Sequence, residues 1–252
     1  MRYDVARMSN RSNDIKAFNL PRGHIVAGKY EVRSLLGAGW EGEVYRVVER
    51  RTGIHRAMKL FFPQRNVRDK AVRFYAKKLD RLRHCRIVIQ YHHSETIRHG
   101  QHVISCLMSE FVEGTLLSRM IERHPQHRLE VFEALHLLHA LAAGLEEIHA
   151  AHEYHGDIHS GNVLVRRNGI RYDVKLVDFY HWGRTSRYNI REDVIQLVHL
   201  FHESLGGRAT YAAHPPEVKA ICRGLRRDLL KKRFPTARYL REHLETCEWR
   251  TR

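Results

Sequence analysis

The chain has 252 residues, 43% of them apolar, which is enough to bury a hydrophobic core in one large domain or two small lobes. Its 44 Lys and Arg exceed its 28 Asp and Glu, and the resulting net charge of +16 favours polyanionic or acidic partners. Its 4 cysteines lack CxxC spacing, which disfavours a zinc ribbon or disulfide framework, and no apolar run suits a signal peptide or membrane span, so we expect a cytoplasmic location.

The first part of the chain predicts strands. Residues 1–24 are polar and are expected to form an N-terminal extension. From 30 to 62 the pattern is strand-like, with two β-type runs around GAGWEG and a third, IHRAMKLFF, after a Thr-Gly turn. Residues 67–83 have apolar positions at helical spacing, and two further strands are expected within 87–112. This order predicts an antiparallel sheet with one inserted helix.

The second part is predicted to be mostly helical. Residues 129–150 form a long amphipathic pattern, and the loop YHGDIHSGN follows it at 154–162. A β-hairpin comes next, because Asn168-Gly169 separates two β-type runs, and amphipathic helical patterns continue to the end. The fold class expected is α+β with two lobes and a cleft between them, comprising residues 25–112 and 113–252.

Three glycines in GAGWEG, Gly37, Gly39 and Gly42, lie between two predicted strands. Without side chains, such a turn lets backbone N–H groups approach a phosphate. No helix follows this GxGxxG pattern, which counts against a dinucleotide-binding fold. An ordinary hairpin turn would need only one or two glycines.

Ala57 and Lys59 are two positions apart on a predicted strand and therefore share a face. Val44, on the strand after the glycines, is expected to line the same pocket. A small pocket of this kind would admit a flat purine, with Lys59 reaching toward its phosphates. The alternative is a surface lysine on an edge strand.

Asp157 and Asn162 lie in the loop before the hairpin. A carboxylate at Asp157 is suited to accept a proton from a substrate hydroxyl, and Asn162 offers an oxygen to a hard cation. Folding the hairpin about Asn168-Gly169 places Asn162 near Lys175, so Asp178 emerges at the same end of the ribbon. Asn162 and Asp178 are therefore expected to share Mg²⁺, with an ordinary turn as the alternative.

In this order the motifs GAGWEGEV, AMK, HGDIHSGN and VDF resemble the protein-kinase-like superfamily over roughly residues 30–247. The resemblance implies ATP and Mg²⁺ as cofactors, with Lys59 anchoring the α- and β-phosphates and Asp157 as catalytic base. SEFVEGTL resembles the hinge, whose backbone groups contact adenine, and Asp193 resembles the residue that braces the catalytic loop. The implied site residues are Lys59, Asp157 and His159 for catalysis, Gly37, Gly39, Gly42, Val44, Ala57, Lys59, Glu110 and Val112 for the nucleotide, and Asn162 and Asp178 for the metal.

Two departures concern single residues of that pattern. In the family a helix glutamate pairs with the strand lysine, but here Tyr75 occupies its position and no Glu occurs between Glu49 and Glu95. We therefore expect either that Lys59 finds another acid or that the helix lies apart from it. Tyr180 replaces the glycine that usually follows Asp-Phe, which makes a large flip of this segment less favourable.

The activation segment is expected to be short. Only 14 residues separate Asp178 from Asp193, and no Ala-Pro-Glu sequence lies between them. Gly156 replaces the arginine that would sense a phosphorylated segment, so no phosphorylation switch is expected. His159 replaces a lysine, as in HGD-type relatives such as aminoglycoside phosphotransferases.

Three function classes fit these features. A Ser/Thr-type protein kinase is favoured by the glycine-rich loop, the AMK strand and the end helices. The alternatives are a small-molecule or lipid-saccharide kinase, favoured by the HGD loop and the short segment, and a nucleotide-binding pseudokinase. The acceptor of the phosphate would carry a hydroxyl. Because the chain has a net charge of +16, an acidic acceptor would suit it. The basic residues are dispersed and not interleaved with aromatics, so no dedicated nucleic-acid site is expected.

Overall fold

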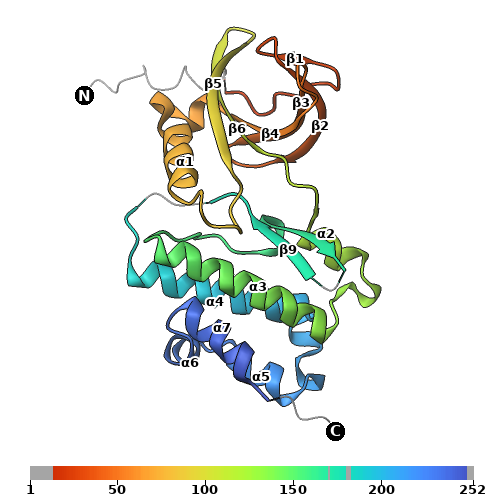
Figure 1. The fold of residues 1–252 in the computed structure, drawn as a ribbon, viewed down its shortest axis with the longest axis vertical. Helices are drawn as coiled ribbons and strands as arrows, with labels where there is room; N and C mark the ends of the chain where they lie inside the picture. The colour runs from red at the N-terminus through yellow and green to blue at the C-terminus, as the bar shows by residue number, and fades with distance from the viewer. Residues whose placement is uncertain (1–13, 170, 180–182, 249–252) are drawn as a thin grey trace, which may run out of the picture. The chain divides into compact units, whose positions relative to one another are not determined.

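The computed structural model describes residues 14–169, 171–179 and 183–248 (Figure 1). Contacts divide the chain into two compact units. Among the described residues, the first unit contains those up to Asp80 together with Gln90–Phe111, and the second contains Arg81–Ile89 and those from Val112 onward. Strands dominate the first unit and helices the second, which confirms the predicted α+β class.

The first unit is built on an antiparallel sheet with the strand order β1-β2-β3-β4-β6-β5. One long helix, α1, follows β4 after two short 3₁₀ turns and corresponds to the predicted inserted helix. The elements are β1 (Ile25–Val26), β2 (Tyr30–Ala38), β3 (Gly42–Glu49), β4 (His55–Phe61), the turns Pro63–Arg65 and Val67–Asp69, α1 (Lys70–Arg81), β5 (Tyr91–His99) and β6 (His102–Glu110).

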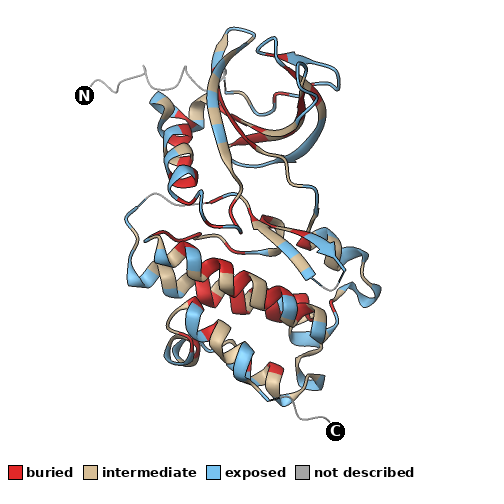
Figure 2. Ribbon diagram, in the orientation of Figure 1, coloured by how far each residue is buried: buried red, intermediate tan, exposed pale blue. Residues whose placement is uncertain are grey.

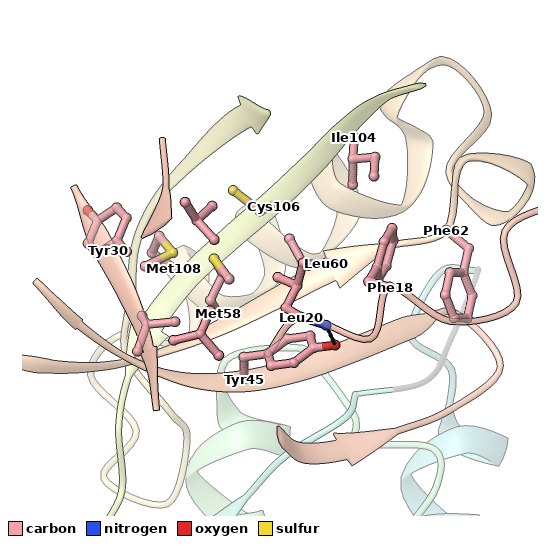
Figure 3. Packing of buried hydrophobic residues seen from close by; sticks show 13 residues of the cluster. Phe18, Leu20, Tyr30, Tyr45, Met58, Leu60, Phe62, Ile104, Cys106 and Met108 are labelled. Carbon is pink, nitrogen blue, oxygen red and sulfur yellow. Dashed lines mark hydrogen bonds between the residues drawn. The ribbon is translucent and has the colours of Figure 1, made fainter. Parts of the chain in front are cut away.

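Alternation along the strands separates a core face from an outer face. On β4, Met58 and Leu60 are fully buried, whereas Ala57 and Lys59, which alternate with them, are only partly buried. The buried face belongs to an apolar cluster with contributions from β2, β3, β4 and β6 (Figure 3). The opposite face of β3 and β4 is the one on which the sequence predicts a nucleotide pocket.

The described part of the N-terminal extension packs into this core. Phe18 and Leu20 are buried members of the apolar cluster, and Figure 3 shows them beside Tyr45 and Phe62. The Phe18 N–H donates to the Glu43 carboxylate at 3.1 Å, and the Leu20 N–H donates to the Tyr45 hydroxyl at 3.2 Å. Glu43 is a buried acid on β3, and its donors are the extension and the Tyr45 hydroxyl rather than solvent.

The second unit combines helices with a small antiparallel sheet in the order β7-β8-β9. The long helix α3 packs against α4, α7 and β9, and Figure 2 shows buried residues along its length. The elements are β7 (Thr115–Leu116), α2 (Leu117–Arg123), α3 (Val131–Ala150), β8 (Val163–Asn168), β9 (Arg171–Leu176), α4 (Arg187–Ser204), α5 (Pro216–Cys222), α6 (Arg227–Arg233) and α7 (Ala237–Thr246), with 3₁₀ turns at Pro125–His127, Ser160–Asn162, Gly207–Ala209, Tyr211–Ala213 and Arg223–Leu225.

The segment Arg81–Ile89 belongs to this second unit, whereas the sequence predicts it in the first lobe. Ile87 explains the difference. Its side chain occupies the space beside Gly144 on α3, where an added Cβ would come within 2.4 Å of it, and its carbonyl accepts from the Leu176 N–H at 2.7 Å. A glycine inside α3 thus lets this segment pack closely on the helix.

The hairpin of β8 and β9 forms as predicted, but its register differs. Asn168 pairs with Arg171, so Gly169, at φ 62°, opens the loop and Asn168 still belongs to β8. Lys175 therefore lies opposite Leu164, and the expectation that it lies near Asn162 is wrong. The Val177 N–H instead donates to the Asn162 carbonyl at 3.0 Å, so Asp178 still emerges at the end of the ribbon where Asn162 lies. Among the described residues, the helices are all too short or too polar to cross a membrane.

Candidate active site

The glycine-rich turn joins β2 and β3. Within it the Gly39 N–H donates to the Gly42 carbonyl at 2.9 Å. A Cβ added to Gly42 would lie 1.8 Å from the Leu60 carbonyl oxygen, so this glycine is required by the neighbouring strand. A Cβ at Gly37 or Gly39 would meet nothing within 4 Å, so the space beside these two residues is open to a ligand. The glycines thus serve two different purposes.

The predicted shared face of β3 and β4 is confirmed by their register. Val44 pairs with Lys59, and Arg46 pairs with Ala57. Directly paired residues point to the same side of an antiparallel sheet, so Val44, Ala57 and Lys59 lie together on the face opposite the apolar core. The side chain of Lys59 is only 13% exposed.

Lys59 has an acidic partner that the sequence analysis did not identify. Its Nζ lies 3.0 Å from Oε2 of Glu41, which belongs to the glycine-rich turn and is 11% exposed. The ring of Tyr75 on α1 lies 4.1 Å from the same Nζ, at a distance suited to a cation–π contact. Of the two alternatives for Lys59, another acid and a distant helix, the structure supports the first while α1 still reaches the lysine through Tyr75.

The predicted hinge residues follow β6. Glu110 ends that strand, and its N–H donates to the Gln90 carbonyl at 2.9 Å. Any backbone contact of Glu110 with a nucleotide would therefore use its carbonyl oxygen. Val112 is the first residue after Phe111, where the chain passes into the second unit.

The catalytic-loop residues predicted from HGDIHSGN contact one another. The Asn162 side chain donates to the backbone oxygen of Asp157 at 3.0 Å and to its carboxylate at 3.2 Å. His159 places Nε2 3.5 Å from the same carboxylate, and both side chains are about half exposed. The other ring nitrogen of His159 accepts from the Gly161 N–H at 3.1 Å, which fixes the orientation of the ring. A carboxylate, an amide and an imidazole thus converge at one accessible place.

Asp193 on α4 braces this loop, as predicted. Its carboxylate is fully buried and accepts from the N–H groups of His155 at 2.8 Å and Gly156 at 2.7 Å. His149 on α3 also contacts it, with Nε2 at 3.1 Å. Gly156 has φ 88°, a region that favours glycine, so its presence in place of arginine also has a local backbone reason.

Asp178 follows β9 and is exposed, with φ 58° in the left-handed region that few non-glycine residues adopt. The next residue, Phe179, is 1% exposed, and its ring centroid lies 4.5 Å from that of His155. The buried ring holds the segment in place while the carboxylate next to it stays accessible. Tyr180, singled out in the sequence, lies outside the described residues.

The histidines between residues 149 and 159 make separate contacts. His149 contacts Asp193, His155 the Val177 carbonyl at 3.0 Å, and His159 the Asp157 carboxylate. Across residues 14–169, 171–179 and 183–248, no group of three or more His, Cys, Asp and Glu is arranged to hold a metal ion. Oxygen atoms of Asn162 and Asp178 are the hard ligands that the site offers instead.

The fold and this arrangement define a protein kinase domain, and comparison with known proteins agrees. A sequence model of the protein kinase domain family matches residues 30–213. The chain therefore belongs to that family.

Among its relatives, the serine/threonine-protein kinase PknA of Mycobacterium tuberculosis is 28% identical over 160 residues, which are 62% of this chain and 36% of PknA. The serine/threonine-protein kinase Pkn2 of Myxococcus xanthus is 30% identical over 162 residues, 63% of this chain and 19% of Pkn2. The chain thus spans about a third or less of the length of these relatives. A solved structure of a double mutant of the M. tuberculosis PknI kinase domain has a TM-score of 0.67 at 19% identity, covering 90% of this chain and 98% of that one, which shows a common fold.

Proposed function

We propose that this chain is an ATP-dependent Ser/Thr protein kinase. The observation that carries the proposal is the set of bonds that joins Asn162 to Asp157 and Val177 to Asn162. They bring a carboxylate and an amide together and lead the chain directly to the exposed carboxylate of Asp178. Such a set suits phosphoryl transfer, in which the protein mainly positions the reactants and stabilises charge.

Each group has a role that follows from its surroundings. The open space beside Gly37 and Gly39 suits the approach of the phosphates, and Lys59 supplies a positive charge on the adjoining strands. Val44 and Ala57 would line the adenine pocket, with backbone groups of Glu110 and Val112 as adenine contacts.

Asp157 would accept the proton of the acceptor hydroxyl. The hydroxyl oxygen would bond to the γ-phosphorus of ATP while the bond from that phosphorus to the leaving ADP breaks. His159, beside Asp157, replaces the lysine that commonly contacts the transferring phosphate.

Asn162 and Asp178 fit a Mg²⁺ site. The Asn162 amide nitrogen is used on Asp157, which turns its carbonyl oxygen toward other ligands, and Asp178 is exposed. When bound, Mg²⁺ would neutralise the negative charge that develops on the phosphates.

The acceptor is proposed to be a protein hydroxyl in an acidic sequence. A net charge of +16 supports this preference, because a basic surface attracts acidic peptides. Raising the salt concentration should then lower kcat/KM for an acidic peptide more than for a neutral one. Equal salt dependence for the two peptides would contradict an acidic acceptor.

A second candidate is a small-molecule kinase. It is favoured by the short stretch of sequence between Asp178 and Arg187, the first residue of α4. So short a segment leaves little chain to form a platform for a peptide. We also keep a nucleotide-binding pseudokinase as the third class.

Labelled ATP separates the candidates. Wild type, Asp157→Asn and Asp228→Asn are incubated with a generic protein substrate and with a metabolite extract. Asp228 is an exposed acid on α6 paired with Arg226, so its variant is the matched control. Transfer to protein by wild type and Asp228→Asn but not by Asp157→Asn supports the proposal, whereas transfer only to metabolites supports the second candidate. A thermal-shift scan showing no Mg²⁺-dependent stabilisation by ATP would favour the pseudokinase.

A further inference from the structure

The family position for an acid on the helix is occupied here by Tyr75, which cannot neutralise a lysine. Lys59 is 13% exposed, and an ammonium group this far removed from water needs a negative partner. The Tyr75 ring, centred 4.1 Å from Nζ, offers its π face, which carries no net charge. Glu41 supplies such a charge at 3.0 Å.

Other acids near the start of α1 are committed elsewhere. Asp69 accepts from Asn66 Nδ2 at 3.2 Å and from the Ser105 hydroxyl. Glu43, the neighbouring acid on β3, is turned into the apolar core and accepts from the Phe18 N–H at 3.1 Å. Glu41 is thus the acid of the glycine-rich turn that faces the lysine.

The backbone holds Glu41 in that place. Its carbonyl accepts from the Phe62 N–H at 2.8 Å, just beyond the end of β4. On one side, the indole of Trp40 lies 4.0 Å from the guanidinium of Arg65. On the other, Gly42 lies directly against the Leu60 carbonyl. Contacts on three consecutive residues therefore fix the tip of the turn beside β4.

We infer that Glu41 is the positioning residue for Lys59, in the role that the family gives to a helix glutamate; this inference rests on the proposed kinase function. The acid that aligns the lysine belongs to the same turn that, in the proposed function, contacts the phosphates. The turn and Lys59 are consequently aligned together, and α1 contributes an aromatic wall at Tyr75 in place of a charge.

The test uses Glu41→Gln, which keeps the shape of the side chain and removes its charge. Glu31→Gln is the matched control, because Glu31 lies on β2 and pairs with Arg33 at 2.8 Å. We expect Glu41→Gln to lower kcat by about tenfold or more at saturating ATP, since a misplaced phosphate anchor costs transition-state alignment. Glu31→Gln should stay within about twofold of wild type, as expected for a partly exposed surface pair.

A rescue variant separates positioning from general damage. Because Tyr75 already contacts the lysine, Tyr75→Glu in the Glu41→Gln background puts an acid back within reach of Lys59. Recovery of about tenfold or more in kcat supports the inference. Activity that stays lost in a double variant with a wild-type melting temperature overturns it, and so does a Glu41→Gln variant whose activity equals or exceeds that of wild type.

Failure of the proposed function gives a different result. If wild type transfers no phosphate to any acceptor, the kinase proposal fails and the catalytic role of Glu41 fails with it. If wild type is active and Glu41→Gln is equally active, the assignment of Glu41 alone is overturned. The melting temperatures of wild type, Glu41→Gln, Lys59→Met and the double variant report the ion pair itself. The ion pair is supported if Lys59→Met shifts the melting temperature less in the Glu41→Gln background than in wild type. Equal shifts in the two backgrounds overturn it.

Discussion

Asn162 is bonded to Asp157 through one amide group that donates both to the backbone oxygen at 3.0 Å and to the carboxylate at 3.2 Å. The bonds fix which way the amide faces and hold the carboxylate in one rotamer. Asn162→Ala removes both effects and one proposed metal ligand. We expect kcat/KM to fall by about 10²-fold and the Mg²⁺ concentration for half-maximal rate to rise.

The control for that measurement is Asn168→Ala. Asn168 also bonds to an aspartate five residues away, Asp173, but in the exposed hairpin. Its replacement should leave the Mg²⁺ requirement unchanged. A similar loss of activity in both variants would contradict the assignment of Asn162.

The two kinds of glycine in the glycine-rich turn predict opposite phenotypes. Gly42→Ala would force a Cβ to within 1.8 Å of the Leu60 carbonyl oxygen, so we expect a loss of about 3 kcal/mol or more in the free energy of unfolding. Gly39→Ala has open space around it and should cost less than about 1 kcal/mol while weakening ATP binding. Urea unfolding and nucleotide titration measure the two effects, and equal destabilisation would contradict this account.

Tyr45 predicts a pH dependence of stability. Burial, reinforced by its hydrogen bond to Glu43, raises the pKa of Tyr45 from 10.0 to about 12. Between these values the unfolded chain has released the proton while the folded one retains it, so the free energy of unfolding falls as pH rises from 10 to 12. Below pH 10 this contribution is fully present.

Tyr45→Phe removes the contribution of the Tyr45 hydroxyl to the pH dependence of stability, and wild type is the reference for it. Urea unfolding of both proteins across the pH range should show a steeper decline for wild type. Burial also raises the pKa of Cys106 to about 11 and that of Cys222 to about 12, but these two thiols affect both proteins equally. Parallel curves would contradict the assignment to Tyr45. At neutral pH the variant should be less stable by about 1–2 kcal/mol, since the Leu20 N–H and Glu43 each lose a partner.

The segment before α4 is expected to work without phosphorylation. Ser186 caps this helix, accepting from the Asn189 N–H at 3.3 Å, while Asn189 accepts from the Ser186 N–H at 3.1 Å. Ser186→Ala should therefore cost about 1 kcal/mol of stability. Phosphatase treatment of wild type should leave kcat unchanged, because Gly156 offers no positive charge to a phosphate. A phosphorylated residue between 181 and 190 that controls activity would contradict this prediction.

Much of the fold could be predicted because its motifs depend on local chemistry. Alternation placed Val44, Ala57 and Lys59 on one face, and the long apolar period of residues 129–150 gave α3 almost in full. The hairpin was found from Asn168-Gly169, but its register depends on which residue opens the loop. The pairing of Asn168 with Arg171 decided that, and no pattern in the sequence distinguished it.

The partner of Lys59 was missed for a physical reason. Glu41 and Glu43 are two positions apart, so strand alternation would put them on one face. Glu41 precedes the first residue of β3, so the conformation of the turn sets the direction of its side chain. Glu43 lies within β3, and its side chain follows the strand alternation into the core. The signal available was an acid inside the glycine-rich turn together with the lack of one on the helix.

The docking of Phe18 and Leu20 affects where this domain can be trimmed. The match to the kinase family begins at residue 30, and a boundary chosen from that match would remove two apolar side chains from the interior of the sheet. It would also strip the carboxylate of Glu43 of its backbone donor. A protein shortened in this way would expose the apolar surface that Phe18 and Leu20 cover, next to the carboxylate of Glu43. Poor solubility of such a protein would therefore say nothing about its catalytic residues.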